Sequence, residues 1–222
     1  MKNLIKAFEK ESLSSLNPEM KTKILWDNHY KKEKSKLKYP DENLVRILSS
    51  LPNRGKALDF GAGSGRHSVL LKDFGFEVYA ADYSEKSIEQ IQLLNLDIHT
   101  SIVGSPPFRL QSEEFDLIVN WGVLHYNTLE ESIKILKEFY RILKPGGILA
   151  GTIRSKNDTY LKVKNTEIQI EDLKGGQIFL YSFDELKDLL KDFSYSEFGY
   201  SERSPIGKLE ERICHWIFKA RK

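Results

Sequence analysis

The sequence has one cysteine, little net charge and no long apolar run, and each shortage excludes a class of protein. Cys214 has no second cysteine to pair with, so an intrachain disulfide is excluded and a structural zinc site lacks its thiolates. The formal charge of +2 over 222 residues is too small for a general nucleic-acid binder. No apolar run approaches the roughly 20 residues of a membrane span, so no membrane partner is expected.

The first ten residues alternate lysines with apolar side chains and contain neither the apolar core nor the cleavage site of a secretory signal. We therefore expect a cytoplasmic protein. The five histidines have no spacing with acids or with one another that suits a metal ligand set, so no metal is expected. The length suits one substantial core and is short for two, which predicts one domain with an appendage.

The pattern of apolar residues changes near residue 50. Residues 1–50 are expected to form a helical cap, with one helix over 20–34 and a second that opens at Pro40. In residues 51–222, the expected main domain, short apolar runs alternate with helical segments. The expected strands cover residues 57–60, 78–81, 98–103, 115–121 and 147–153, and the helices between them cover 65–74, 84–95 and 129–143. This alternation predicts an α/β fold with a doubly wound, mostly parallel sheet.

After Arg154 the alternation stops. Residues 155–177 are polar and lysine-rich, and we expect them to form a flap over one end of the sheet. A helix over 183–193 and closing strands over 193–200 and 213–218 are expected to follow. The flap is a place where substrate selection could occur.

A glycine-rich turn occupies residues 59–65, with the sequence Asp-Phe-Gly-Ala-Gly-Ser-Gly, between an apolar strand and a helix. Glycines there let the backbone turn sharply and approach a ligand without a side-chain clash. The spacing lacks the Gly-x-Gly-x-x-Gly dinucleotide pattern, and no Gly-Lys-Ser/Thr follows to hold phosphates. The turn therefore favours a ligand without phosphates.

Asp82 lies 17 residues beyond Gly65, at the end of the next expected strand. Doubly wound folds place an acid at this point to accept hydrogen bonds from ribose hydroxyls. The glycine turn and Asp82 together indicate a nucleoside ligand. The alternative is that Asp82 is only an acid at the start of the following helix.

Three motifs now occur together, at residues 57–66, 115–119 and 143–147. In order and spacing they resemble the class I methyltransferases that use S-adenosylmethionine (SAM), and the resemblance covers about residues 50–154. It implies a Rossmann-like, seven-stranded sheet with an antiparallel strand at its end. It also implies SAM as the cofactor and S-adenosylhomocysteine (SAH) as the product.

The resemblance assigns cofactor contacts residue by residue. It places the methionine part of SAM against the glycine turn, the ribose at the acid after the second strand, and the adenine beside the residue that follows. The residues at the end of the fourth strand are also implied to face the cofactor. The residues so assigned are Asp59, Gly61, Ala62, Gly63, Gly65, Asp82, Tyr83, Asn120 and Trp121.

Residues 105–108, with the sequence Ser-Pro-Pro-Phe, depart from the family pattern. Many relatives carry an acid after the third strand to meet the adenine amino group, and here Ser105 or backbone groups are expected to take that place. The tetrapeptide also matches a motif of DNA and protein amino-methyltransferases. In those enzymes it ends the fourth strand, whereas here residues 115–121 are the better fourth strand, so we interpret 105–108 as a proline-containing loop.

The N-terminal stretch resembles the cap of bacterial small-molecule methyltransferases. Trp26, Tyr30 and Tyr39 are candidates to close over the cofactor, exclude water and attract the sulfonium through their aromatic faces. The alternative for each of them is packing of the cap onto the sheet. After the fourth strand, His125 and Tyr126 are the substrate-side, catalytic candidates, with His125 as the general base if the acceptor must lose a proton.

The expected function is methyl transfer from SAM to a small polar molecule by direct displacement. One alternative is a nucleic-acid or protein methyltransferase, favoured by the lysine cluster at 31–38, which we otherwise interpret as a solvated helix face and its exit loop. Another is a non-catalytic SAM-binding module, since a binding turn does not prove turnover. The oligomeric state stays open, with a homodimer among the alternatives.

Overall fold

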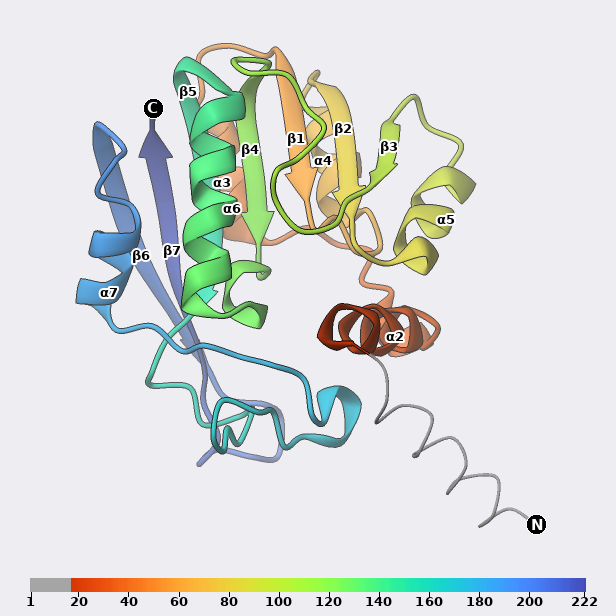
Figure 1. The fold of residues 1–222 in the computed structure, drawn as a ribbon, viewed down its shortest axis with the longest axis vertical. Coiled ribbons are helices and arrows are strands. Elements are labelled where there is room, and N and C mark those ends of the chain that lie inside the picture. The colour runs from red at the N-terminus through yellow and green to blue at the C-terminus, as the bar shows by residue number, and fades with distance from the viewer. Residues whose placement is uncertain (1–16) are drawn as a thin grey trace.

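In the part of the chain that the computed structural model describes, residues 17–222, seven strands form one sheet in the order β3-β2-β1-β4-β5-β7-β6 (Figure 1). Strand β7 is antiparallel to its neighbours β5 and β6, and the pairs among β1 to β5 are parallel. This confirms the predicted doubly wound sheet with an antiparallel strand near its end. The strands are β1 Lys56–Phe60, β2 Glu77–Asp82, β3 His99–Ile102, β4 Phe115–Trp121, β5 Leu143–Arg154, β6 Tyr195–Arg203 and β7 Ile213–Arg221.

Helices cover both faces of the sheet, with α6 in front of it and α4 behind it in Figure 1. One apolar core lies under α6 and α7, and a second lies under α3 and α4. The helices are α2 Pro18–Tyr30, α3 Glu42–Ser49, α4 Arg66–Asp73, α5 Glu85–Leu93, α6 Leu129–Ile142 and α7 Phe183–Leu189. No helix within residues 17–222 combines the length and apolar character that a bilayer crossing requires.

Local sequence explains where these helices begin. Thr128 and Glu131 form a reciprocal capping box at the start of α6, and Ser182 and Glu185 form another at the start of α7. Ser84 caps α5 by accepting from the Ser87 amide. These caps satisfy amides that would otherwise lack partners at the helix ends.

Several predicted boundaries differ from the structure; among them, the helix expected over 183–193 ends at Leu189 and the strand expected over 213–218 continues to Arg221. The helix expected over 20–34 ends at Tyr30 and is followed by a short 3-10 turn at Glu33–Ser35. Strand β5 begins at Leu143 instead of 147, because Leu143 pairs with Phe115 of β4 ahead of a register shift. Strand β6 continues to Arg203, paired with β7 along its length. The part of the expected cap before residue 17 lies outside the described residues.

The predicted flap lies beside α2, below the carboxyl ends of the parallel strands (Figure 1). Its apolar side chains form a small cluster of their own, against which Trp26 and Tyr126 pack. Asp172 of the flap also forms ion pairs with Lys32 and Lys34, at 3.3 and 2.5 Å. These contacts join the cap to the flap, and they give two lysines of the basic cluster a structural role.

The core under α6 provides a test of the fold. Phe139 is fully buried and its ring lies 4.9 Å from that of Phe60, whereas Tyr140, the next residue, is 37% exposed. We expect Phe139→Ala to lower the free energy of unfolding by about 3–5 kcal/mol and Tyr140→Ala by about 1 kcal/mol, because only the first leaves a cavity. Urea unfolding of both variants measures the difference, and equal losses would contradict this packing.

Candidate functional site

The glycine turn from β1 to α4 has neighbours that leave no space for side chains. Gly61 and Gly63 have φ angles of 73° and 57°, a region that L side chains rarely adopt. A Cβ on Gly61 would overlap a methyl group of Val123, and one on Gly63 would lie 2.7 Å from the Tyr30 hydroxyl. The backbone here therefore lies directly against the cap and against the segment after β4.

Gly65 and Ala62 have a different environment from the other residues of the turn. A Cβ on Gly65, whose φ is 81°, would lie 2.9 Å from the side chain of Ile91 on α5. Ala62 is buried in a cluster with Ala80, Ile88 and Ile91. Both residues pack the turn against α5, and the cofactor role that the resemblance implied for them stays a prediction.

Asp82 forms hydrogen bonds with both the turn after β1 and the turn after β2, at the carboxyl ends of these strands. One carboxylate oxygen accepts from the Gly63 amide and the other from the Ser84 amide, both at 2.8 Å. Burial raises the pKa of Asp82, and the two amide donors act in the opposite direction. The α5 N-cap is Ser84, so Asp82 is more than the helix-start acid considered as the alternative.

Asp59 is buried at the start of the same turn and accepts from the Ser68 hydroxyl at 2.6 Å. Burial, reinforced by the negative charge of Asp82, raises its pKa to about 7, although the Ser68 hydrogen bond and the Arg66 charge act against the shift. Sequence reasoning missed Ser68, which lies one turn inside α4 with no motif to mark it. A cation placed beside a buried carboxyl group with a raised pKa lowers that pKa and stabilises the carboxylate.

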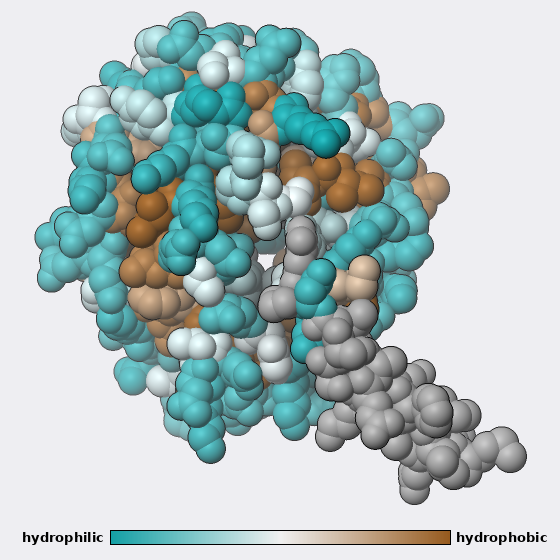
Figure 2. Space-filling model, in the orientation of Figure 1, coloured by the Kyte–Doolittle hydropathy of each residue, from teal (hydrophilic) through white to brown (hydrophobic). Residues whose placement is uncertain are grey.

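Asn120 lies at the end of β4, next to the glycine turn, because β4 pairs with β1 through Asp59 and Val119. Its side chain is fully buried, and neither its amide nitrogen nor its oxygen has a hydrogen-bond partner within residues 17–222. Buried amides are almost always hydrogen-bonded. Asn120 therefore marks a place for a polar ligand, and Figure 2 shows a narrow opening near the centre of this face, at the level of these strand ends in Figure 1.

Trp121, the next residue, is on the other face of the sheet. Its ring lies 5.7 Å from that of His67 on α4, and it packs against the core under α3 and α4. Burial and the Arg66 charge lower the pKa of His67 to about 3, and its Nε2 accepts from the Asp41 amide at 3.3 Å. Trp121 therefore packs on that face, and the cofactor contact expected of it stays a prediction.

Two of the three aromatic residues of the cap lie against the site. The Trp26 ring is 4.8 Å from that of Tyr126 and 6.1 Å from that of Tyr30. Burial raises the pKa of Tyr30 well above its usual value, and the Asp82 charge adds to the shift. The third, Tyr39, lies apart from them: its side chain is 84% exposed, and its backbone carbonyl accepts from Arg66 at 3.0 Å, so a cofactor contact for it stays a prediction.

His125 and Tyr126 lie together after β4, with ring centroids 4.3 Å apart. The Nδ1 atom of the buried His125 accepts from the Arg154 amide at 3.3 Å, so the proton of the neutral ring is on Nε2. Burial, then the charges of Arg154 and His215, hold the pKa of His125 well below its usual value. Both features argue against His125 as a general base. Burial raises the pKa of Tyr126.

The Ser-Pro-Pro-Phe segment lies in the loop after β3, as predicted, and does not end β4. Phe108 is buried against Phe60, and its amide donates to Glu138 at 2.9 Å. Ser105 is exposed in the same loop. This segment is anchored by its aromatic residue and does not form the amino-methyltransferase motif.

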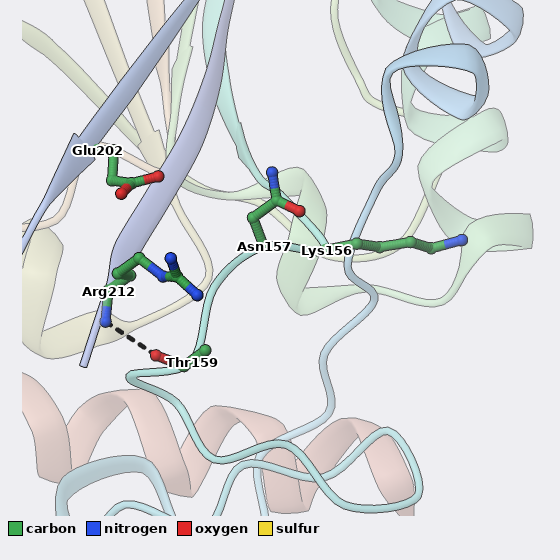
Figure 3. Close-up of a pocket in the computed structure, with 5 residues that line it drawn as sticks. All are labelled: Lys156, Asn157, Thr159, Glu202 and Arg212. Atoms are coloured by element: carbon green, nitrogen blue, oxygen red, sulfur yellow. Dashed lines mark hydrogen bonds between the residues drawn. The ribbon is translucent and has the colours of Figure 1, made fainter. Parts of the chain in front are cut away.

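A separate polar hollow of about 470 Å³ lies where the flap leaves β5 (Figure 3). The Lys156 side chain points away from it and pairs with Glu185 at 2.8 Å, while the Arg212 amide donates to Thr159 at 2.8 Å. No residue of the glycine turn lines it. Within residues 17–222, no group of three or more histidine, cysteine or acidic side chains could hold a metal ion.

Comparisons with known proteins agree with this arrangement. A family model described as a methyltransferase domain matches residues 30–196. A malonyl-[acyl-carrier protein] O-methyltransferase from Enterobacter lignolyticus is 32% identical over 48% of this chain and 42% of its own length. Phosphoethanolamine N-methyltransferase 1 from Triticum aestivum is 30% identical over 56% of this chain and 27% of its own length. The chain thus spans less than half of the length of these two relatives.

The fold has solved counterparts. The crystal structure of a SAM-dependent methyltransferase from Methanosarcina mazei matches with a TM-score of 0.66 at 21% identity, over 80% of this chain and 96% of that one. This likeness shows that the chain has the Rossmann-like α/β fold of such methyltransferases. The family model matches well over half of the chain, and the matched range includes the glycine turn and Asp82. The chain therefore belongs to the class I SAM-dependent methyltransferases.

Proposed function

We propose that this enzyme holds SAM over Gly61 and Gly63 and moves the methyl group to a small polar molecule by direct displacement. The observation that carries the proposal is the Asn120 side chain, which is buried without a partner in the described chain beside the glycine turn. Its amide can both donate to and accept from the methionine end of the cofactor. A purely structural role would leave this amide unsatisfied.

The carboxylates flank the same place. Asp59 is suited to the cofactor's amino group, because a nearby cation favours the ionised form of a buried carboxyl. Asp82 is suited to the ribose hydroxyls, since a carboxylate has lone pairs beyond the two that the backbone amides use. Tyr83 and Ser105 remain candidates for the adenine side.

When bound, SAM supplies a methyl group on a sulfonium, already activated for displacement. The residues of the chain then have to align the acceptor and exclude water. Trp26, Tyr30 and Tyr126 lie together beside the glycine turn, and the flap packs against Trp26 and Tyr126. We assign His125 as a neutral hydrogen-bond donor on the acceptor side, through Nε2, and not as the base.

The closed arrangement of cap and flap favours a small acceptor over a macromolecule. The flap is joined to the cap by the Lys32 and Lys34 ion pairs with Asp172 and by the apolar cluster around Trp26. The relatives do not identify the methyl acceptor of this chain, because the names of two of them specify different acceptors, a malonyl-[acyl-carrier protein] and phosphoethanolamine. The chemical class of the acceptor therefore has to be inferred from the residues of the site.

Two glycines with similar backbones provide a matched test of cofactor binding. Gly63 and Gly75 both have positive φ, at 57° and 85°, but a Cβ on Gly75 would meet nothing within 4 Å. We expect Gly63→Ala to weaken SAH binding at least about tenfold and Gly75→Ala to change it less than about twofold. Positive φ should cost each variant about 1 kcal/mol of stability, and Gly63→Ala should lose more than that because the Tyr30 hydroxyl must also shift. Calorimetric titration of the folded variants measures this.

A third variant distinguishes a clash with the cofactor from a clash with Tyr30 of the cap. In Gly63→Ala combined with Tyr30→Phe, the hydroxyl that the new methyl group approaches is removed. Affinity should stay low, because the methyl group still occupies ligand space. Full recovery of SAH binding in this double variant would assign Gly63 to packing against Tyr30 and remove it from the cofactor site.

Asp59 predicts proton release on SAM binding. With a pKa of about 7 it is partly protonated near neutral pH, and the cofactor's ammonium group lowers that pKa, so a fraction of a proton should leave per SAM bound. The part of the release that Asp59→Asn removes should shrink as the pH rises above 7, because Asp59 is then already ionised before SAM binds. Calorimetry in buffers of different ionisation enthalpy measures it. Asp59→Asn should abolish the release and the exposed Asp73→Asn should retain it; release unchanged in Asp59→Asn would contradict the assignment.

A further inference from the structure

Three side chains from strands β5, β6 and β7 share one face of the sheet beside the segment after β4. Arg154 on β5 is directly opposite His215 on β7, and Arg203 on β6 is opposite Ile213. Opposed residues point to the same face, and so do residues two apart along one strand. Arg154, His215 and Arg203 are therefore on one face at the carboxyl end of β5.

The two arginines keep hydrogen-bonding capacity in the described chain. The Arg154 side chain is 9% exposed and forms an ion pair with Asp158 through Nη1, but its buried Nε has no partner within residues 17–222. Asp158 is fully engaged, because its oxygens also accept from the Leu161 and Cys214 amides. A buried guanidinium N–H without a partner is costly, so Arg154 marks a site for an acceptor of hydrogen bonds.

Arg203 is exposed, and its guanidinium forms no hydrogen bond or ion pair with the residues that the structure describes. Its positive charge acts on its neighbours. Burial, followed by the charges of Arg154 and Arg203, lowers the pKa of His215 to about 3, with Asp41 acting weakly in the opposite direction. The imidazole is therefore neutral in an electropositive setting, where it can donate or accept without repelling an anion.

This group adjoins the acceptor side of the site. The His215 ring lies 6.1 Å from that of His125, and the Arg154 amide donates to His125. Because a guanidinium presents its donors in a planar fork, it matches the geometry of carboxylate and phosphate oxygens. None of these three residues belongs to the glycine turn.

We propose that the methyl acceptor is a small anion, and that its carboxylate or phosphate group is bound by Arg203 and the Nε–H of Arg154 beside His215. The inference rests on the proposed function and adds the chemical class of the acceptor. The anionic group anchors the acceptor at β5 and β6. The atom to be methylated then lies toward His125 and Tyr126.

Titration of the SAH-saturated enzyme with simple anions tests the site directly. Inorganic phosphate and acetate are the two probes, with sodium chloride at equal ionic strength as the control, and the arginine Nε–H resonances report on binding. We expect phosphate or acetate, and not chloride, to shift the Arg154 and Arg203 signals saturably. The anion that binds more tightly identifies the acceptor's anionic group as a phosphate or a carboxylate. An equal response to chloride would overturn the proposal.

A matched pair of variants locates the binding. Arg203→Gln should weaken the bound anion about tenfold, whereas Arg221→Gln, an exposed arginine at the other end of the β6–β7 hairpin, should change it less than about twofold. Unchanged SAH affinity in both variants excludes a general loss of structure. Equal anion affinity in the two variants would place the anion elsewhere and overturn the proposal.

Turnover separates this inference from the proposed function. The substrates are carboxylates and phosphate monoesters, each paired with its neutral amide or alcohol, and SAH formation is measured. SAH formation with only the anionic substrate of each pair supports the proposal. Formation with the neutral members alone overturns it and leaves the proposed function intact, whereas failure to bind SAM at all removes the proposed function. If no member is turned over, the anion titration decides.

Discussion

The buried carboxylate of Asp82 joins the ends of two neighbouring parallel strands, and the rest of the site depends on that junction. It accepts from Gly63 in the turn after β1 and from Ser84 in the turn after β2. The hydrogen bonds hold the glycine turn in its left-handed conformation, with its backbone toward the cap. Without them, two amides at the strand ends would be buried without partners, which is costly in a water-poor site.

Burial then sets the protonation of the groups around this junction. It raises the pKa of Asp59 to about 7 and lowers those of His67 and His215 to about 3. The imidazoles are therefore neutral at physiological pH, and the positive charge near the acceptor side comes from arginine. A site of this kind recognises its ligands through fixed charges and hydrogen bonds, and methyl displacement needs alignment more than proton transfer.

Much of the fold could be predicted because its signals are local. The apolar run at 115–121 became β4 without change, and the glycine turn and Asp82 lie at the expected strand ends. Individual side-chain environments are less local. The Tyr39 side chain is exposed and its carbonyl accepts from Arg66, and α5 approaches Gly65, contacts that depend on how separate segments pack.

The acceptor side could not be predicted in the same way. His125 is in the expected segment, but its tautomer depends on an amide of Arg154 in another strand. Arg154, His215 and Arg203 come together only through the register of β5, β6 and β7, which no local pattern specifies. Non-local strand pairing thus determines the part of the site that chooses the acceptor.

A crystal structure of the enzyme with SAH is the most direct test of the central claim, that the unpartnered amide of Asn120 and the glycine turn hold the cofactor. We expect the methionine part of SAH to lie against Gly61 and Gly63, with the Asn120 amide hydrogen-bonded to the ligand and Asp82 at the ribose hydroxyls. SAH bound away from this turn, or an Asn120 amide that still lacks a partner in the complex, would contradict it.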